Sequence, residues 1–209
     1  MNSFGLGATA LAILVTAQAA QACGSGKVVF EDKFETLAPT WGAASEEQDV
    51  SKGQLMLRPK ANYTNWIPST ASLYDDIDMC VQVTAIAAID PNNGFVGLIF
   101  WYVDDATFYS FEYDATGRAS VWRRQRSKWL KQIDWQKADA LNAGDGATNE
   151  LRVVTVGKKA TFFINGKKFG ELNGVPPDDG QEIGFIASSP QKGVASYGFA
   201  DFVVSEPEK

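Results

Sequence analysis

Short runs of apolar and β-branched residues recur along the chain from Val28 onward, and Gly, Asn, Asp and Pro separate them. Thr107–Tyr113 alternates, with aromatic side chains at 109, 111 and 113 on one side and Ser110 and Glu112 on the other. A period of two indicates a strand with two unlike faces. Gly97–Val103 is apolar on both faces, which predicts a central strand that is covered on both sides.

The clearest local signal is a hairpin. Two strand-like runs, Ala160–Ile164 and Lys167–Leu172, are separated by Asn165 and Gly166. Asn and Gly both tolerate the positive φ that a type I′ turn requires. The sequence therefore predicts a two-residue turn at this point.

Further runs of strand type fill the rest of the chain, and Ala138–Leu141 is the one short segment that suggests a helical turn. Roughly ten to twelve strands at regular spacing predict an all-β, two-sheet antiparallel sandwich rather than βαβ units. These further predicted strands are Val28–Phe34, Gln54–Arg58, Met79–Ile86, Ser120–Gln125, Lys128–Ile133, Leu151–Val156, Glu182–Ala187 and Tyr197–Val204.

The first residues have the character of an export signal. Residues 6–20 are mainly apolar, and Ala20-Gln21-Ala22 has the small-x-small form of a cleavage site. This stretch is too short to span a bilayer, which takes about 20 apolar residues. We therefore expect a signal peptide at 1–22, a single sandwich domain at 23–209, and a periplasmic or secreted protein.

The sequence contains two cysteines, Cys23 and Cys80. In an oxidising compartment such a pair predicts one disulfide, Cys23–Cys80. The alternatives are a buried free thiol at Cys80 and lipidation of Cys23.

Charge and missing residue types exclude several functions. The formal net charge is −6, and residues 1–22 carry none of it, so nucleic acid and anionic membranes are not expected as partners. The chain has no histidine, which excludes a Ser-His-Asp triad and any site in which histidine binds zinc or copper.

The order of motifs resembles the concanavalin A-like lectin/glucanase superfamily, with its laminin-G-like and DUF1080 (3-keto-disaccharide hydrolase) members. The resemblance implies a jelly roll with one concave sheet, on which ligands are often held, but this fold serves lectins, glycosidases and adhesion modules alike. It rests on Phe30–Phe34, Trp41, Lys52–Leu57, Gly97–Phe100, Asp104–Tyr109, Gly117, Val121–Arg123, Asn149–Val153, Phe163–Lys167, Gly184–Ala187 and Phe199–Phe202.

Two carboxylates are the candidates for catalysis. Laminarinase-type relatives carry Glu-x-Asp-x-x-Glu on one strand, and Glu112-Tyr113-Asp114 begins in this way, but Gly117 follows without a third acid. A retaining glycosidase needs two facing carboxyl groups. If the protein is an enzyme, Glu112 and Asp114 are the expected pair; otherwise they form the solvated end of a strand.

Indoles and guanidiniums are interleaved between Trp122 and Trp129. Indole faces stack on sugar rings, and Arg binds hydroxyls or carboxylates. We therefore expect Trp122, Arg124, Arg126 and Trp129 to form a carbohydrate site, and the cations of this segment suggest an anionic polysaccharide as one form of the ligand. Arg123 points to the opposite face, toward solvent or toward Glu112 on a neighbouring strand.

Three acidic clusters, at 75–78, 90–93 and 104–105, raise the alternative of a calcium site, although no EF-hand spacing is present. Asp and Asn also favour turns. We expect no metal ligand set and no cofactor, with calcium as the alternative.

These observations favour an exported, non-catalytic carbohydrate-binding module. A glycoside-active hydrolase or lyase of the 3-keto-disaccharide type is the first alternative, and a structural or protein-binding domain is the second. The incomplete carboxylate signature argues against an enzyme.

Overall fold

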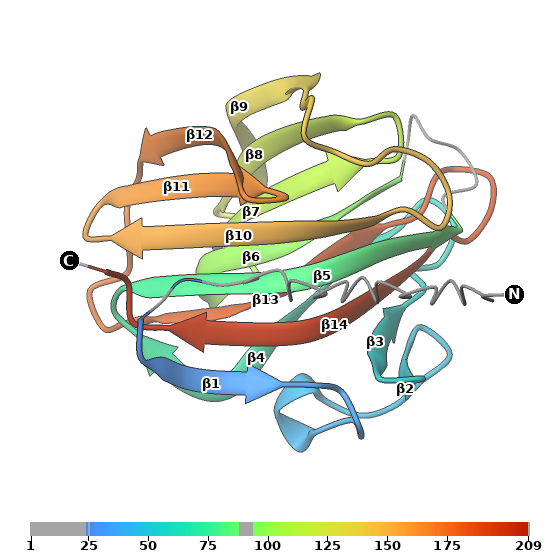
Figure 1. The fold of residues 1–209 in the computed structure, drawn as a ribbon, viewed down its shortest axis with the longest axis horizontal. Helices are drawn as coiled ribbons and strands as arrows, with labels where there is room; N and C mark the ends of the chain where they lie inside the picture. The colour runs from blue at the N-terminus through green and yellow to red at the C-terminus, as the bar shows by residue number, and fades with distance from the viewer. Residues whose placement is uncertain (1–23, 25, 88–93, 209) are drawn as a thin grey trace, which may run out of the picture.

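A computed structural model describes residues 24, 26–87 and 94–208. In this part of the chain, an eight-stranded and a six-stranded antiparallel sheet pack face to face as a sandwich (Figure 1). The predicted all-β jelly-roll sandwich is confirmed. Within the same ranges no helix is long and apolar enough to cross a bilayer.

The eight-stranded sheet has β5 and β14 at its centre, and β14 pairs with β3 near its start and with β1 near its end. In spatial order its strands are β12 (Lys167–Asn173), β11 (Lys159–Ile164), β10 (Thr148–Val156), β5 (Ile77–Ala87), β14 (Ser196–Ser205), β3 (Gln54–Leu57) and β2 (Gln48–Ser51), with β1 (Val28–Asp32) beside β14.

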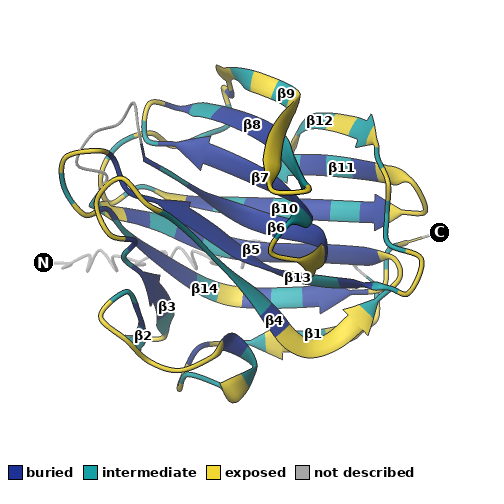
Figure 2. Cartoon of the chain, turned by 180° about the vertical axis from the view of Figure 1, so that it is seen from behind, coloured by how far each residue is buried: buried dark blue, intermediate teal, exposed yellow. Residues whose placement is uncertain are grey.

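The six-stranded sheet carries the candidate site. In spatial order its strands are β4 (Thr64–Tyr74), β13 (Gln181–Ser188), β6 (Phe95–Asp104), β7 (Thr107–Asp114), β8 (Arg118–Gln125) and β9 (Lys128–Lys137). In Figure 2, β6 and β7 are largely buried, whereas β9 is largely exposed and curls out of the plane of the sheet.

The predicted hairpin is confirmed between β11 and β12. Asn165 and Gly166 both have positive φ, 48° and 74°. Two strands, β2 and β4, were not predicted, and the expected helical turn at Ala138–Leu141 is a single hydrogen-bonded turn without helix. A short 3-10 turn, η1 (Pro39–Trp41), also lacked a sequence signal.

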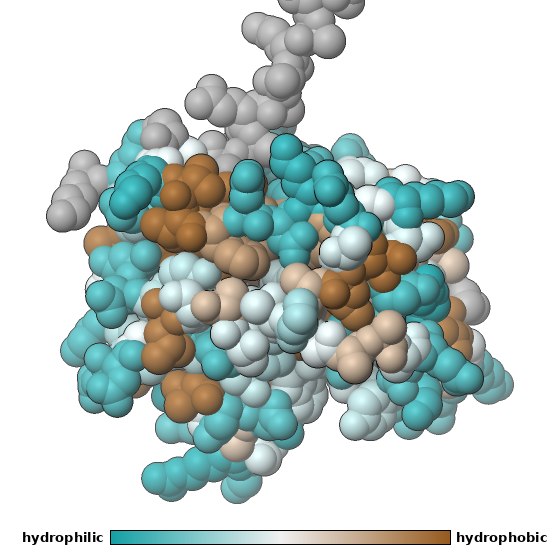
Figure 3. Space-filling view, turned by 90° about the horizontal axis from the view of Figure 1, so that it is seen from below, coloured by the Kyte–Doolittle hydropathy of each residue, from teal (hydrophilic) through white to brown (hydrophobic). Residues whose placement is uncertain are grey.

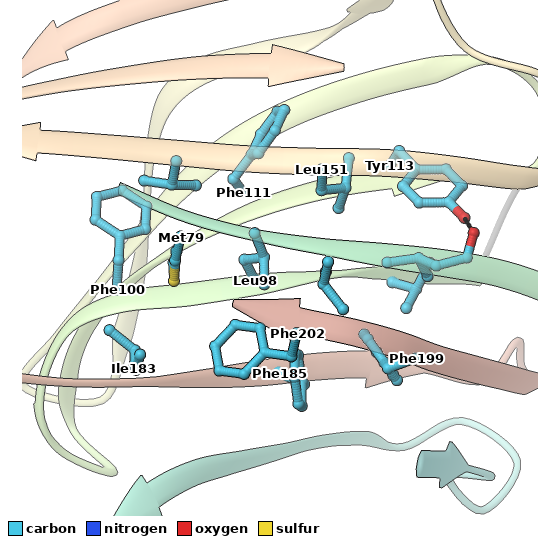
Figure 4. Packing of buried hydrophobic residues seen from close by; sticks show 14 of the residues in the cluster. Met79, Leu98, Phe100, Phe111, Tyr113, Leu151, Ile183, Phe185, Phe199 and Phe202 are labelled. Atoms are coloured by element: carbon cyan, nitrogen blue, oxygen red, sulfur yellow. Dashed lines mark hydrogen bonds between the residues drawn. The ribbon is translucent and has the colours of Figure 1, made fainter. Parts of the chain in front are cut away.

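The core lies between the two sheets, and aromatic side chains from both fill much of it (Figure 4). Phe185 on β13 packs against Phe199 on β14 with ring centroids 4.4 Å apart. Tyr113 on β7 crosses the sandwich, and its hydroxyl donates a 3.3 Å hydrogen bond to the carbonyl of Val83 on β5. Trp101 is also in the core, as predicted, with 1% of its surface exposed.

Hydrophobic side chains on the surface are divided by hydrophilic ones. On the face seen in Figure 3 they form small patches rather than one continuous area. Large apolar patches are the usual mark of a protein interface.

Candidate functional site: an aromatic cleft on the six-stranded sheet

Alternation along β7 sets which side chains face away from the core. Phe111 and Tyr113 belong to the core, so Glu112 and Asp114 project from the opposite face of the sheet. On β8, Ser120 lies directly opposite Glu112. The two acids of the incomplete hydrolase signature therefore share the outer face at the middle of the sheet.

A cleft of about 560 Å³ opens above these acids. β7 contributes two carboxyl groups, and the neighbouring strands β6, β8 and β9 contribute aromatic rings. Such a mixture of apolar surface with a few polar groups is typical of small-molecule sites. The lining residues are Thr64, Gly94, Phe95, Glu112, Asp114, Arg118, Trp122, Trp129 and Trp135.

The curl of β9 closes the cleft. Phe95 on β6 and Trp135 on β9 have ring centroids 6.2 Å apart. Three strand spacings separate β6 from β9, which is about 14 Å in a flat sheet. The contact therefore requires β9 to bend over the face of the sheet, so that aromatic rings flank β7 on both sides.

Glu112 lies buried in this cleft, with 2% of its surface exposed. The Ser110 hydroxyl donates a 2.5 Å hydrogen bond to Oε1 of Glu112. Burial raises the pKa of Glu112 to about 8, because the charged form loses its hydration, and the Ser110 hydrogen bond opposes this effect only in part. At neutral pH the side chain is therefore mainly an uncharged acid.

Asp114 is also buried, at 4% exposure, but the fold uses its oxygens. Oδ1 accepts hydrogen bonds from the backbone N and the hydroxyl of Thr116, at 3.0 and 2.6 Å, and from the backbone N of Arg118 at 3.1 Å. Oδ2 accepts from Nε of Arg118 at 2.9 Å and pairs with Nη2 at 2.7 Å. Asp114 therefore fixes the β7–β8 turn and positions Arg118.

These positions overturn one expectation. The interpretation of Glu112 and Asp114 as the solvated end of a strand is wrong, because the aromatic rings of the neighbouring strands enclose both acids. Gly117, where the hydrolase signature would have a third acid, lies in the β7–β8 turn with φ 87°. That backbone conformation explains a glycine at this position.

Of the four residues predicted to bind a ligand, Trp122 and Trp129 line the cleft. Arg124 does not: its guanidinium lies between the rings of Trp66 and Trp129, 4.9 and 5.2 Å from their centroids. Arg126 is exposed in the β8–β9 turn with φ 51°. The structure thus brings the two indoles together and leaves both guanidiniums outside the lining.

Arg123 does not pair with Glu112, as the sequence had suggested it could. Arg123 lies opposite Tyr109, and its guanidinium is 5.2 Å from that ring on the other face of the sheet. A pair between Arg123 and Glu112 is excluded, because Glu112 faces Ser120. Among the described residues that line the cleft, Arg118 is the only cation, and Asp114 neutralises it.

A second, more polar cavity of about 410 Å³ adjoins the cleft, because Thr64 lines both. Its other lining residues are Asn62, Ser188, Ser189 and Gln191. The Thr64 hydroxyl donates a 3.1 Å hydrogen bond to the Ser188 hydroxyl. The site therefore has an aromatic part and a polar extension.

Five lining residues had no predicted role: Thr64, Gly94, Phe95, Arg118 and Trp135. Trp135 belongs to the tryptophan-rich segment after β7, so the signal for it was present in the sequence. Phe95 is distant along the chain and meets Trp135 only through the curl of β9. Thr64 lies on β4, a strand that was not predicted.

The acidic clusters have structural partners where the structure describes them. Asp78 forms a bidentate ion pair with Arg152, and Asp76 accepts a hydrogen bond from the backbone N of Gly157. Asp105 accepts hydrogen bonds from Trp66 and from Tyr102. The cluster at 90–93 lies outside the described residues, and within them no group of three His, Cys, Asp or Glu side chains is arranged to hold a metal ion.

Cys80 is fully buried on β5. Cys23 lies outside the described residues, so its pairing with Cys80 stays a prediction. The next residue, Gly24, lies against Asp78 and Arg152, and Arg152 is directly opposite Cys80 in the register. This placement supports the predicted disulfide.

No protein-family model and no curated protein matches the chain. Solved structures do. The carbohydrate-binding module CBM66 from Bacillus subtilis is 12% identical, with a TM-score of 0.59 over 73% of this chain and 86% of its own. LamAcat from Zobellia galactanivorans is 10% identical, with a TM-score of 0.59 over 86% of this chain and 98% of its own.

The GH43 protein BlXynB from Bacillus licheniformis is 15% identical, with a TM-score of 0.65 over 85% of this chain. Our chain spans 39% of the length of that protein, so the match is to one part of it. At such identities the comparisons show the fold alone. The chain has a two-sheet antiparallel jelly-roll sandwich, the fold that it shares with these structures.

Proposed function

We propose that this protein is an exported, non-catalytic carbohydrate-binding domain that acts in the periplasm or outside the cell. The observation that carries the proposal is the cleft itself, in which aromatic rings surround a buried, uncharged carboxyl group. Sugar rings have apolar C–H faces and polar edges, so they match indoles combined with a few hydrogen-bonding groups.

The charges at the cleft favour an uncharged saccharide over the anionic polysaccharide that the sequence suggested. The cationic side chains of the 122–131 segment lie elsewhere: Arg124 stacks on indoles, and Lys131 pairs with Asp134 at 2.6 Å. Arg118 is already neutralised by Asp114. An anionic sugar would lose its hydration here without gaining an unpaired cation from the described lining residues, which is unfavourable.

A glycan array with the purified protein, read with and without calcium, tests the proposal. Trp135→Ala should weaken binding by at least about tenfold, which corresponds to about 1.4 kcal/mol. Trp66→Ala is the matched control, because Trp66 is a partly exposed indole on the same sheet and outside the cleft lining. An array without any bound glycan would refute the proposal and favour a structural or protein-binding domain.

One observation favours an enzyme as the second candidate. A buried acid with a pKa of about 8 is a suitable general acid for cleaving a glycosidic bond. A hydrolase also needs a second carboxylate, and Asp114 is engaged by Arg118 and Thr116. Release of reducing ends from array-positive saccharides, lost in Glu112→Gln, would establish the enzyme.

A further inference from the structure

The carboxyl groups of Glu112 and Asp114 differ in how many hydrogen bonds they form with the rest of the fold. Asp114 has both oxygens in hydrogen bonds with the β7–β8 turn. Glu112 lines the open cleft, and within the described residues its Oε1 accepts a hydrogen bond from the Ser110 hydroxyl. The fold engages this carboxyl less than that of Asp114, so a ligand in the cleft can form a hydrogen bond with it.

The strand next to Glu112 places a glycine beside it. Gly97 on β6 lies directly opposite Glu112, and a Cβ at Gly97 would lie 2.8 Å from the Glu112 Cα. A larger residue at this position would press on the Glu112 backbone, whereas glycine adds no side chain above the carboxyl. Glycine at 97 therefore permits the close approach of β6 to the backbone of Phe111 and Glu112.

The surroundings of Glu112 keep it protonated. The residues opposite it, Gly97 on β6 and Ser120 on β8, carry no charge. On its own strand Ser110 is neutral, and Asp114 is neutralised by Arg118 on β8. On β9, Lys131 and Asp134 form an exposed ion pair with each other.

Among the described residues around Glu112, no unpaired cation therefore stabilises its carboxylate. The pKa of about 8 means that about nine in ten molecules carry the proton at pH 7. Because the Ser110 hydroxyl donates to Oε1, the proton resides on Oε2.

We propose that Glu112 binds the saccharide as an uncharged acid, with its Oε2–H donating a hydrogen bond to an acceptor oxygen of the sugar. Ligand binding is then linked to this proton: the ionised carboxylate has no hydrogen to donate. This inference rests on the proposed carbohydrate function and identifies the residue that makes binding pH-dependent. The ring and glycosidic oxygens of a neutral saccharide are acceptors of the required kind.

The expected size of the effect follows from the fraction of protein in the binding form. Apparent affinity scales with that fraction, so it should be nearly constant below pH 7 and fall about tenfold per pH unit above about pH 8. Glu112→Gln supplies the matched variant. Its amide donates a hydrogen bond at every pH, so it should keep the affinity and lose the pH dependence.

Isothermal titration calorimetry with xylotriose, cellotriose and mannotriose, from about pH 6 to about pH 9.5, tests this linkage. The wild-type protein should bind at least one of them about tenfold more weakly at pH 9 than at pH 7. Glu112→Gln should bind that sugar with the same affinity at both pH values. Glu112→Ala should bind it weakly at every pH. Glu182→Gln, which changes a partly buried acid on β13 outside the cleft lining, should reproduce the wild-type profile.

Thermal melts at each pH confirm that every variant is folded. Wild-type binding that does not change with pH, or a Glu112→Gln variant that keeps the wild-type pH profile, overturns the role of Glu112 and leaves the carbohydrate function intact. If the wild-type protein binds none of the trisaccharides at any pH, the carbohydrate function itself fails, and this inference fails with it.

Discussion

Replacing Glu112 with Gln should make the unliganded protein less sensitive to alkaline pH. Gln has nearly the same shape, and its carbonyl oxygen can accept the hydrogen bond that Ser110 now donates to Glu112. At low pH, where Glu112 is protonated in both the folded and the unfolded chain, the two proteins should therefore have similar free energies of unfolding. The difference should appear as pH rises.

The pKa of Glu112 is raised in the folded state, from 4.5 to about 8. Between these values the folded protein holds a proton that the unfolded chain has released, so the free energy of unfolding falls as pH rises. Each pH unit in this window is worth about 1.4 kcal/mol, which gives at most about 5 kcal/mol in total. Above pH 8 both states are ionised and the loss is complete.

Urea denaturation followed by tryptophan fluorescence, from about pH 4 to about pH 9, measures this difference. The stability of Glu112→Gln minus that of the wild type should be near zero at the acid end. It should increase through the window from 4.5 to about 8 and then level off. A difference that is constant with pH would refute the reasoning, because it would show that Glu112 ionises in the folded protein as easily as in the unfolded chain.

Four further outcomes are expected. Gly166→Val should lower the free energy of unfolding by about 1–2 kcal/mol, because φ at this turn is 74°, and an unchanged urea midpoint would contradict this. Mass spectrometry of the intact protein should show a Cys23–Cys80 disulfide as a mass increase on reduction, and two free thiols would exclude it. Arg124→Ala should lower the melting temperature and change the sugar affinity little, because its guanidinium packs between the indoles of Trp66 and Trp129 and is itself outside the cleft lining; a large loss of affinity with an unchanged melting temperature would place Arg124 in the binding site. Gln191→Ala should weaken the binding of long oligosaccharides and leave trisaccharides unaffected, since Gln191 lines the polar extension, and equal effects on both would place it outside the ligand path.

The sequence by itself determined the features that depend on neighbouring residues. The alternation in Thr107–Tyr113 placed Glu112 and Asp114 on the face opposite the core aromatics, and Asn165-Gly166 identified a hairpin turn with positive φ. These signals work because strand periodicity and turn conformation are local properties.

The sequence did not predict β4, because its alternation is weak and Pro68 lies near its centre. β4 is an edge strand that pairs with β13 alone, and proline is tolerated at an edge.

Only the tertiary structure showed that the outer face of the six-stranded sheet forms a cleft. The curl of β9 brings Trp135 to within 6.2 Å of Phe95, and this contact turns a strand surface into a cleft. The same enclosure excludes water from Glu112, so a residue that appears as an ordinary surface acid in the sequence becomes a buried, protonated one. Burial and pKa depend on every segment that packs around a group, and here those segments come from β6, β8 and β9, which no local pattern along β7 can reveal.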